Sequence, residues 1–244
     1  AGKEKTYHAW GYATKEEMEK FGRRYNPCGE MYTDADGNKH YYTDQTDNYL
    51  QKNYQLLLNH SFSTAWNLNV ALHYTKGDGY YEEYKPGSSL VEYGLKPFNP
   101  DGTETNESDL VRQKKMDNKF GGGVFSLNYT GNRLTASLGG GLNQYRGNNF
   151  GKVTWVKNYI GNLSPEHEYY RNKSKKTDGN IYLKANYDLT STLSAYADLQ
   201  YRHIDYTIDG VNDKYDWNKN ALRPLAVDKK FDFFNPKVRL NWNI

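Results

Sequence analysis

A cluster of oxygen-bearing side chains early in the chain has the spacing of a calcium-binding loop. Asp34, Asp36 and Asn38 occupy alternate positions, as the first three ligands of an EF-hand do. Lys39 stands where that loop needs glycine, and Gln45 stands where it needs a bidentate glutamate. We therefore predict a hairpin turn here instead of an EF-hand, and a looser calcium contact stays open.

The sequence contains no pattern of residues typical of other metal sites or of catalytic sites. The six histidines show no paired zinc spacing. Cys28 is the only cysteine, so neither a disulfide within the chain nor a thiolate metal cluster can form. No G-x-S-x-G motif, phosphate-binding loop or nucleophilic cysteine arrangement is present. We expect no enzymatic activity, no metal site and no cofactor.

Aromatic and cationic residues in the expected loops are better candidates for function. Aromatic rings can stack on a ligand, and arginines can hold its charged groups. For any single residue, packing within a loop is the commoner role, but loops on a rigid scaffold usually carry specificity as a group. The predicted ligand-binding residues are Trp10, Arg23, Arg24, Tyr80, Tyr81, Tyr84, Tyr145, Arg146 and Trp155.

The composition is typical of a β-structure that has an apolar outer surface and a polar, hydrated interior. Only 36% of the 244 residues are hydrophobic and the mean hydropathy is −1.00, which is too polar for a soluble core of this size. The 24 tyrosines and 16% aromatic content argue against disorder. No run of 18 apolar residues could form a membrane helix. The net charge of +3 is mild, and we interpret the clusters at 173–176 and 114–115 as solvated loops that do not bind nucleic acid.

Strict alternation of apolar and polar residues is the dominant pattern, and it recurs seven times. One run places Leu183 and Ala185 on one face against Lys184 and Asn186 on the other. Runs of this kind begin near residues 54, 66, 125, 134, 181, 193 and 234. Their apolar faces contain no Asp, Glu, Lys or Arg. A Lys or Arg facing lipid at the bilayer midplane costs about 2–4 kcal/mol, so this segregation predicts strands that face lipid.

The opposite faces are polar and carry charges, as expected of a barrel lumen. The residues predicted to face the lumen are Gln55, Asn59, His73, Lys184 and Arg239.

The connections between these runs alternate between short and long. Three links of three or four residues, at 63–65, 130–133 and 190–192, predict tight hairpins. The other links cover 75–120, 143–180 and 202–233. Short turns on one rim and long loops on the other are typical of outer-membrane barrels. The fold is therefore predicted to be all-β: an antiparallel, up-and-down transmembrane β-barrel segment of about seven strands with long extracellular loops.

A short helix is expected before the first strand. Thr14 and Glu17 match a capping box, and Gly22 is a plausible stop for a helix that runs through Lys20.

Three stretches resemble TonB-dependent outer-membrane receptors of the Bacteroidetes type. Thr46–Tyr49 with Asn53–Leu56 looks like the start of a barrel strand in that family. The motif Phe234-Asn235-Pro236-Lys237 is similar to the F-N-P-K strand start of the same barrels, and 5–10 with 24–27 resembles an extracellular loop.

The resemblance covers essentially the whole chain and implies a 22-stranded barrel in the bacterial outer membrane, filled by an N-terminal plug. It also implies import of a scarce nutrient, such as a ferric siderophore, cobalamin or a glycan, driven by the TonB complex. No plug or TonB box is present here, so residues 1–244 are expected to be a partial barrel domain. Its expected partners are membrane lipid, the plug, the TonB complex through the missing N-terminal part, and the nutrient.

Other classes of protein remain as alternatives. A soluble carbohydrate-binding or adhesion module would also show alternation, but its apolar face must meet a second apolar layer. An outer-membrane enzyme would need a catalytic group at its mouth, and an adhesin or passive porin would lack a plug. The transporter interpretation depends on the apolar faces meeting lipid, so Leu56, Leu138, Leu183 and Leu240 must not be covered by protein.

Overall fold

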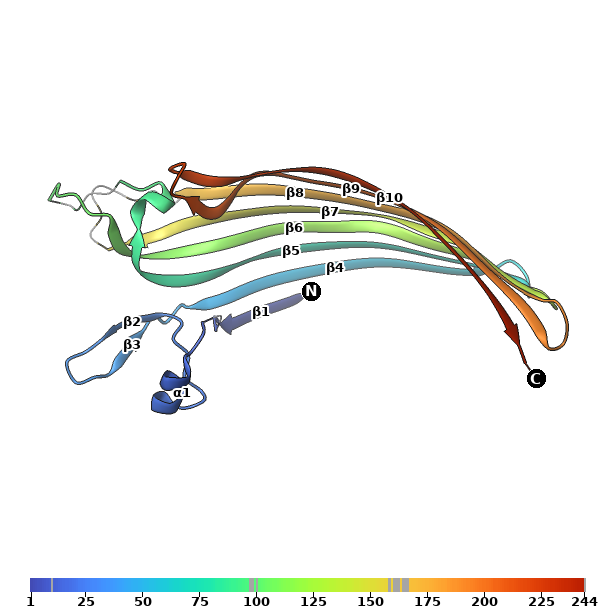
Figure 1. Cartoon of the computed structure of the whole chain (residues 1–244), viewed down its shortest axis with the longest axis horizontal. Helices are drawn as coiled ribbons and strands as arrows, with labels where there is room; N and C mark the ends of the chain where they lie inside the picture. Colours follow the sequence, from blue (N-terminus) through green and yellow to red (C-terminus); the bar gives the residue numbers. More distant parts are fainter. Residues whose placement is uncertain are drawn as a thin grey trace.

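The computed structural model describes residues 1–9, 11–96, 99, 101–157, 159, 163 and 167–243. Eight antiparallel strands form one sheet, in the order β1-β4-β5-β6-β7-β8-β9-β10 (Figure 1). Seven of them are long, as predicted. Their bounds are β4 Thr46–Ser61, β5 Trp66–Ser89, β6 Glu107–Thr130, β7 Leu134–Val156, β8 Glu168–Asp188, β9 Leu193–Asp216 and β10 Ala221–Trp242, and the short β1 is Gly2–Tyr7.

One face of the sheet is apolar and is not covered by protein within the described residues. Residues that lie opposite each other on neighbouring strands share a face, so the apolar residues of successive strands gather on one side. The register pairs Leu127 with Leu138 and Leu138 with Leu183. The four leucines chosen as a test are all exposed, at 66% for Leu56, 40% for Leu138, 49% for Leu183 and 67% for Leu240. Within the described residues, no helix or second sheet covers them. A bare apolar face of this extent belongs against lipid, as predicted.

The opposite face is polar and internally hydrogen bonded. Asn59 accepts a hydrogen bond from Asn67 at 3.2 Å and donates one to Asn69, and Asn69 also donates to Ser126. Such side-chain ladders stabilise neighbouring strands where no apolar packing is available.

All five residues predicted to face the lumen lie on this polar face. Gln55 lies opposite His73, and the His73 Nε2 atom is 2.8 Å from the Asn143 amide oxygen. Lys184 lies opposite Asp198, while Arg239 lies over the Tyr196 ring at 5.3 Å. The five positions therefore share one surface, on the side of the sheet away from the apolar face.

The expected long loops are wrong in extent, because the strands continue well past the apolar band. The links shrink from 75–120, 143–180 and 202–233 to 90–106, 157–167 and 217–220. Beyond the lipid both faces of a strand meet water, so pairing can continue without the alternation that reveals it in the sequence. The clusters 173–176 and 114–115, expected in loops, consequently lie within β8 and β6.

The N-terminal region contains the predicted helix, α1 Lys15–Phe21, with Thr14 and Glu17 forming the capping box and Gly22 as the C-cap. The predicted turn at 34–38 joins β2 Glu30–Thr33 to β3 Lys39–Tyr41. Strand β1 was expected to be loop. It pairs with the first residues of β4, 46–51, which lie beyond the apolar band. Its sequence GKEKTY therefore needs no apolar side. No helix of the described chain is long and apolar enough to cross a membrane.

A small core lies at the end of the sheet where the long links are. Residues 90–95, which include the 3-10 helix η1 Leu90–Tyr93, pack against β6, β7 and β8. We call this segment the cap. Leu90, Leu110 and Val153 are completely buried there. The cap covers the polar side of the sheet close to its end, near the site described next.

Candidate functional site

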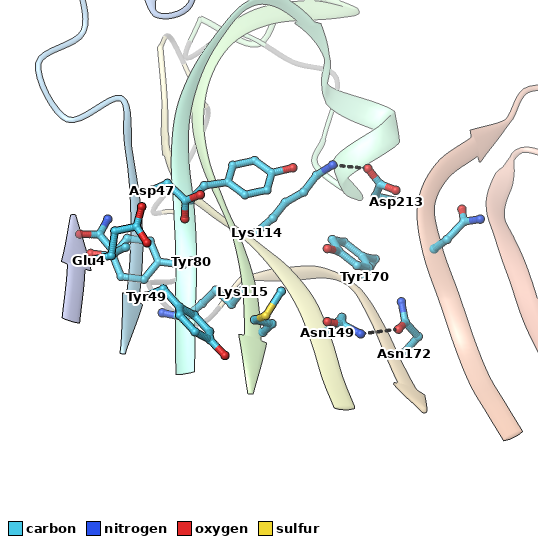
Figure 2. A pocket seen from close by; sticks show the side chains of 15 residues that line it. Glu4, Asp47, Tyr49, Tyr80, Lys114, Lys115, Asn149, Tyr170, Asn172 and Asp213 are labelled. Atoms are coloured by element: carbon cyan, nitrogen blue, oxygen red, sulfur yellow. Dashed lines mark hydrogen bonds and ion pairs between the residues drawn. The ribbon is translucent and has the colours of Figure 1, made fainter. Parts of the chain in front are cut away.

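A pocket of about 570 Å³ opens on the polar side of the sheet, next to the cap (Figure 2). It is built from parallel rows of side chains on β1, β4, β5, β6, β7, β8 and β9. Its lining is rich in tyrosine, asparagine and carboxylate groups. The lining residues are Glu4, Asp47, Asn48, Tyr49, Gly79, Tyr80, Tyr81, Lys114, Lys115, Met116, Asn149, Tyr170, Asn172, Asn212 and Asp213.

An ion pair between distant parts of the chain defines one side of the pocket. Lys114 on β6 bonds to the carboxylate of Asp213 on β9. Figure 2 shows the Lys114 side chain extended toward Asp213. Burial alone would raise the pKa of Asp213, but the hydrogen bond and positive charge of Lys114 outweigh burial and hold that pKa below its usual value. Asp213 is therefore ionised at neutral pH, and it offsets the charge of Lys114.

Two glycines allow Tyr49 to lie flat along the opposite side. A Cβ atom on Gly77 would come within 2.1 Å of the Tyr49 hydroxyl, and one on Gly79 would come within 2.7 Å of its ring. Close approach of a ring to the backbone is possible only without a side chain at those positions. On the far strands, the Asn149 side-chain amide donates to the side-chain oxygen Oδ1 of Asn172 at 3.2 Å (Figure 2).

Tyr81 provides an aromatic surface inside the pocket. Its ring stacks on His8, with centroids 4.9 Å apart, and the Lys114 ammonium lies 5.7 Å from the Tyr81 ring centroid. Burial raises the pKa of Tyr81 and lowers that of His8, so both side chains are uncharged at neutral pH. Burial likewise raises the pKa of Tyr170 across the pocket.

The cap is tied to the sheet by a partly buried arginine. Arg112 on β6 donates from Nε to Glu83 at 2.6 Å and from Nη1 to the Tyr93 hydroxyl at 2.9 Å. A second pocket of about 860 Å³ continues from the first under the cap, and the two share Lys114 and Asp213. The cap lines the second pocket through Val91, Glu92 and Tyr93, so its position controls the shape of that pocket.

The chemistry available here is binding chemistry. The lining carries three carboxylates, but only one of its two lysines, Lys114, lies on the polar side, because Lys115 is the next residue of the same strand. The Lys115 ammonium lies 4.6 Å from the Tyr80 ring centroid. Across the described ranges of the chain, no group of three or more histidine, cysteine or carboxylate side chains could hold a metal ion. Tyrosine rings for stacking and amides for hydrogen bonding remain as the recognition groups.

The residues predicted to bind ligand do not come together at one place. Tyr81 lines this pocket on the polar side, while Tyr80, the preceding residue of β5, borders it from the opposite face of the strand. Tyr145 lines a separate pocket of about 360 Å³ farther along the polar face, beside the ion pair of Asp178 with Arg202. Arg23 and Arg24 are exposed in the turn that follows α1, and Trp10 lies outside the described residues.

The remaining three predicted residues lie on the other side of the sheet. Tyr84 stacks on Trp155 with centroids 6.3 Å apart, and its hydroxyl donates to Asp109. Arg146 lies between Lys119 and Lys175 in register, on the face that carries the apolar band. The expected loop position is wrong for Tyr80, Tyr81, Tyr84, Tyr145, Arg146 and Trp155, which all lie on strands because the strands extend so far.

Sequence reasoning missed most of the pocket. Lys114, Asp213, Tyr170, Asn149 and Asn172 were not selected, because they come from four strands that only the register brings together. The one available signal is the Lys114–Lys115 doublet, and the expectation of a solvated loop there is wrong, because both lysines lie within β6.

Taken together, a wide antiparallel sheet with one lipid-facing side, one polar side, short turns at one rim and a pocket at the other defines an outer-membrane β-barrel wall. The sequence matches the family described as TonB dependent receptor-like, beta-barrel, over residues 5–244. The chain belongs to this family of bacterial outer-membrane receptors.

Among solved structures, the open form of the ferric-catecholate import receptor Fiu from E. coli K12 is similar, with 11% identity and a TM-score of 0.50. The match covers 84% of this chain and 34% of that one, so the chain spans about a third of that receptor's length. At this identity the likeness supports the fold alone. Among curated proteins, none is similar enough to match.

Proposed function

We propose that the chain forms part of the wall of an energy-coupled importer, and that the pocket beside the cap takes part in capturing the nutrient. The observation that carries this proposal is the two-sided sheet, with a lipid-facing side and a polar side that ends in a tyrosine-lined pocket. The family consists of receptors and transporters and is not a class of enzymes. A soluble carbohydrate-binding or adhesion module would instead need to cover its apolar side.

Of the three nutrient classes, a glycan fits the pocket best. Ferric siderophore complexes commonly carry negative charge, and such a ligand would meet more carboxylates than free ammonium groups, since Lys114 is held by Asp213. A sugar needs flat rings against its apolar side and amide or carboxylate partners for its hydroxyls. Tyr81 and Tyr170 supply the rings, and Asn149 with Asn172 supplies the amides.

The polar face would then line the passage below the pocket. We propose that residues 1–244 form a partial barrel domain that contacts a plug through Gln55, Asn59, His73, Lys184 and Arg239. Energy would come from the TonB complex acting on the plug. Trp10, Arg23 and Arg24 stay candidates for ligand contact outside the pocket, and membership of the Bacteroidetes type stays a prediction.

Calorimetric titration of the intact receptor, purified from outer membranes in detergent, tests the choice of ligand. Neutral oligosaccharides, ferric siderophores and cobalamin would be compared on the wild type and on Tyr81→Ala. Loss of one stacking ring should weaken oligosaccharide binding about tenfold, which corresponds to about 1.4 kcal/mol. The matched control is Tyr12→Ala, because Tyr12 is 98% exposed and away from the pocket lining. Tight siderophore binding that is insensitive to Tyr81→Ala would refute the glycan proposal.

A further inference from the structure

Five cations occupy directly opposite positions on five neighbouring strands of the lipid-facing side. In register, Lys52 on β4 pairs with Lys76 on β5, which pairs with Lys119 on β6. Lys119 pairs with Arg146 on β7, and Arg146 pairs with Lys175 on β8. We call these five residues the basic row. At a strand spacing of about 4.8 Å it extends for roughly 20 Å across the sheet.

Within the described chain, the basic row has no carboxylate partner. All five side chains are exposed, and no ion pair joins any of them to an acidic group within the part of the chain that the structure describes. Like charges directly opposite each other destabilise a sheet unless something offsets their repulsion. Asp78 on β5 and Asp117 on β6 occupy the next positions of this face, two residues from Lys76 and Lys119, but form no ion pair with them. Five cations thus face two carboxylates, and the row keeps a net positive charge that an anionic group from outside the described chain would offset.

The same face of the next two strands shows the contrast. There the row continues with Thr207 and Asp228, and the neighbouring charges are internally matched. Lys230 lies 3.9 Å from Asp205, and the His203 ring nitrogen lies 2.7 Å from Asp232. Unmatched positive charge is thus confined to β4–β8 on this face.

The position of the basic row along the strands indicates what supplies the negative charge. Below it, toward the short turns, the exposed apolar band begins at Tyr54, Tyr74, Phe125, Leu142 and Ile181. These residues are two to six positions along their strands from the row, or roughly 7–20 Å at 3.3 Å per residue. Acyl chains that cover the band must place their headgroups at this height, on the side of the long links.

We propose that the basic row binds the phosphate groups of phosphorylated lipid in the outer leaflet of the membrane. Four of the five cations are lysines, which act as mobile point charges and suit phosphates that do not hold one fixed geometry. A row of cations next to the membrane attracts anionic lipid with an energy that adds up residue by residue. Arg146, which sequence reasoning had assigned to nutrient binding, belongs to this surface.

The test measures binding of the intact, delipidated receptor to phosphatidylcholine vesicles that contain bisphosphorylated lipid A, or lipid A from which the phosphates have been removed. The variant that removes the basic row is Lys52→Gln, Lys76→Gln, Lys119→Gln, Arg146→Gln and Lys175→Gln. The control removes five exposed lysines elsewhere, as Lys15→Gln, Lys20→Gln, Lys96→Gln, Lys214→Gln and Lys219→Gln. We expect the first variant to bind phosphorylated lipid A at least about tenfold more weakly, and the control to change by less than about twofold.

Three further comparisons keep the proposal open to refutation. Wild-type binding should fall as salt rises and should not occur with dephosphorylated lipid A. A variant with all five positions exchanged between lysine and arginine should retain binding. Inorganic phosphate should compete only weakly, because the row is continuous with the lipid-facing band. Equal wild-type binding to both forms of lipid A, or equal losses in the two glutamine variants, would overturn the proposal; if the row variant does not assemble, the wild-type lipid comparison decides alone.

Discussion

Lys114 on β6 and Asp213 on β9 form an ion pair although β7 and β8 lie between their strands. Gly151, opposite Lys114 on β7, leaves room for the rings of Tyr169 and Tyr170, which a Cβ atom at Gly151 would meet at 2.3 Å and 2.4 Å. The pair therefore ties together strands that share no backbone hydrogen bonds. It also sets the charge of the pocket, since Lys114 is neutralised before any ligand arrives.

Breaking this pair should cost stability in a pH-dependent way. Asp213 has a pKa below its unfolded value, so its contribution is present above about pH 4 and is lost as pH falls through the folded pKa. A double-mutant cycle with Lys114→Gln and Asp213→Asn, measured by urea unfolding of the receptor in vesicles, should give a coupling of about 1 kcal/mol at pH 7, because both groups are partly exposed. The coupling should decrease as the pH falls through the lowered pKa of Asp213. A coupling near zero at pH 7 would show that the contact has no energetic role.

A charge placed on the apolar side should be far more harmful than the same charge on the polar side. Leu183→Lys should destabilise the receptor in vesicles by about 2–4 kcal/mol, because the ammonium would meet acyl chains. Asn186→Lys, three residues along the same strand and on the polar side, should cost less than about 1 kcal/mol. Urea unfolding of both variants provides the comparison. Similar losses in the two would contradict the assignment of the faces.

These two predictions also show what the sequence could and could not reveal. Lipid disfavours charge on one side of a strand, and this constraint produces the alternation of apolar and polar residues, as at Leu183 and Lys184. Both the seven strands and their faces were therefore predictable from the sequence. Beyond the lipid no such constraint acts. The extensions of β5, β6, β7, β8, β9 and β10, the short β1 and the pocket were therefore missed, because the pocket exists only through a register that places residues such as Lys114 and Asp213 on one surface.

The space left by Gly77 should be required for ligand binding more than for folding. A Cβ at this position would meet the Tyr49 hydroxyl at 2.1 Å and the Asn118 amide oxygen at 2.3 Å, which are both ends of movable side chains. Gly77→Val should therefore move Tyr49 into the pocket and weaken oligosaccharide binding about tenfold or more. Gly179→Ala is the control, because its Cβ would make an ordinary contact of 3.4 Å with Leu142. Unchanged binding in Gly77→Val, measured by calorimetry, would exclude Tyr49 from the site.

The turn between β2 and β3 should resist acid. The Asp34 carboxylate bonds to the His40 ring at 2.9 Å and accepts backbone hydrogen bonds from Asn38 and Asp36. These contacts, led by His40, lower the pKa of Asp34 to about 2. The stabilisation is present above the unfolded pKa near 4 and is lost as pH falls toward 2. Carboxyl NMR of the receptor with labelled aspartate should show Asp34 titrating near pH 2, and His40→Ala should raise that midpoint; a midpoint near 4 in the wild type would disprove the bonding pattern.

Truncating the core of the cap should loosen the cap without unfolding the sheet. Leu90 is 0% exposed and packs with Leu110 and Val153, so Leu90→Ala leaves a cavity that costs about 2–5 kcal/mol. The sheet is held by its own hydrogen-bonded ladder, and the loss should therefore appear as faster amide exchange in residues 90–95 while β6 and β7 stay protected. Val91→Ala is the matched control, since Val91 is only partly buried and should change exchange little. The cap lines the second pocket, which shares Lys114 and Asp213 with the first, so oligosaccharide affinity should fall together with cap protection. Faster exchange throughout β6 and β7 would instead show that the cap and the sheet unfold as one unit.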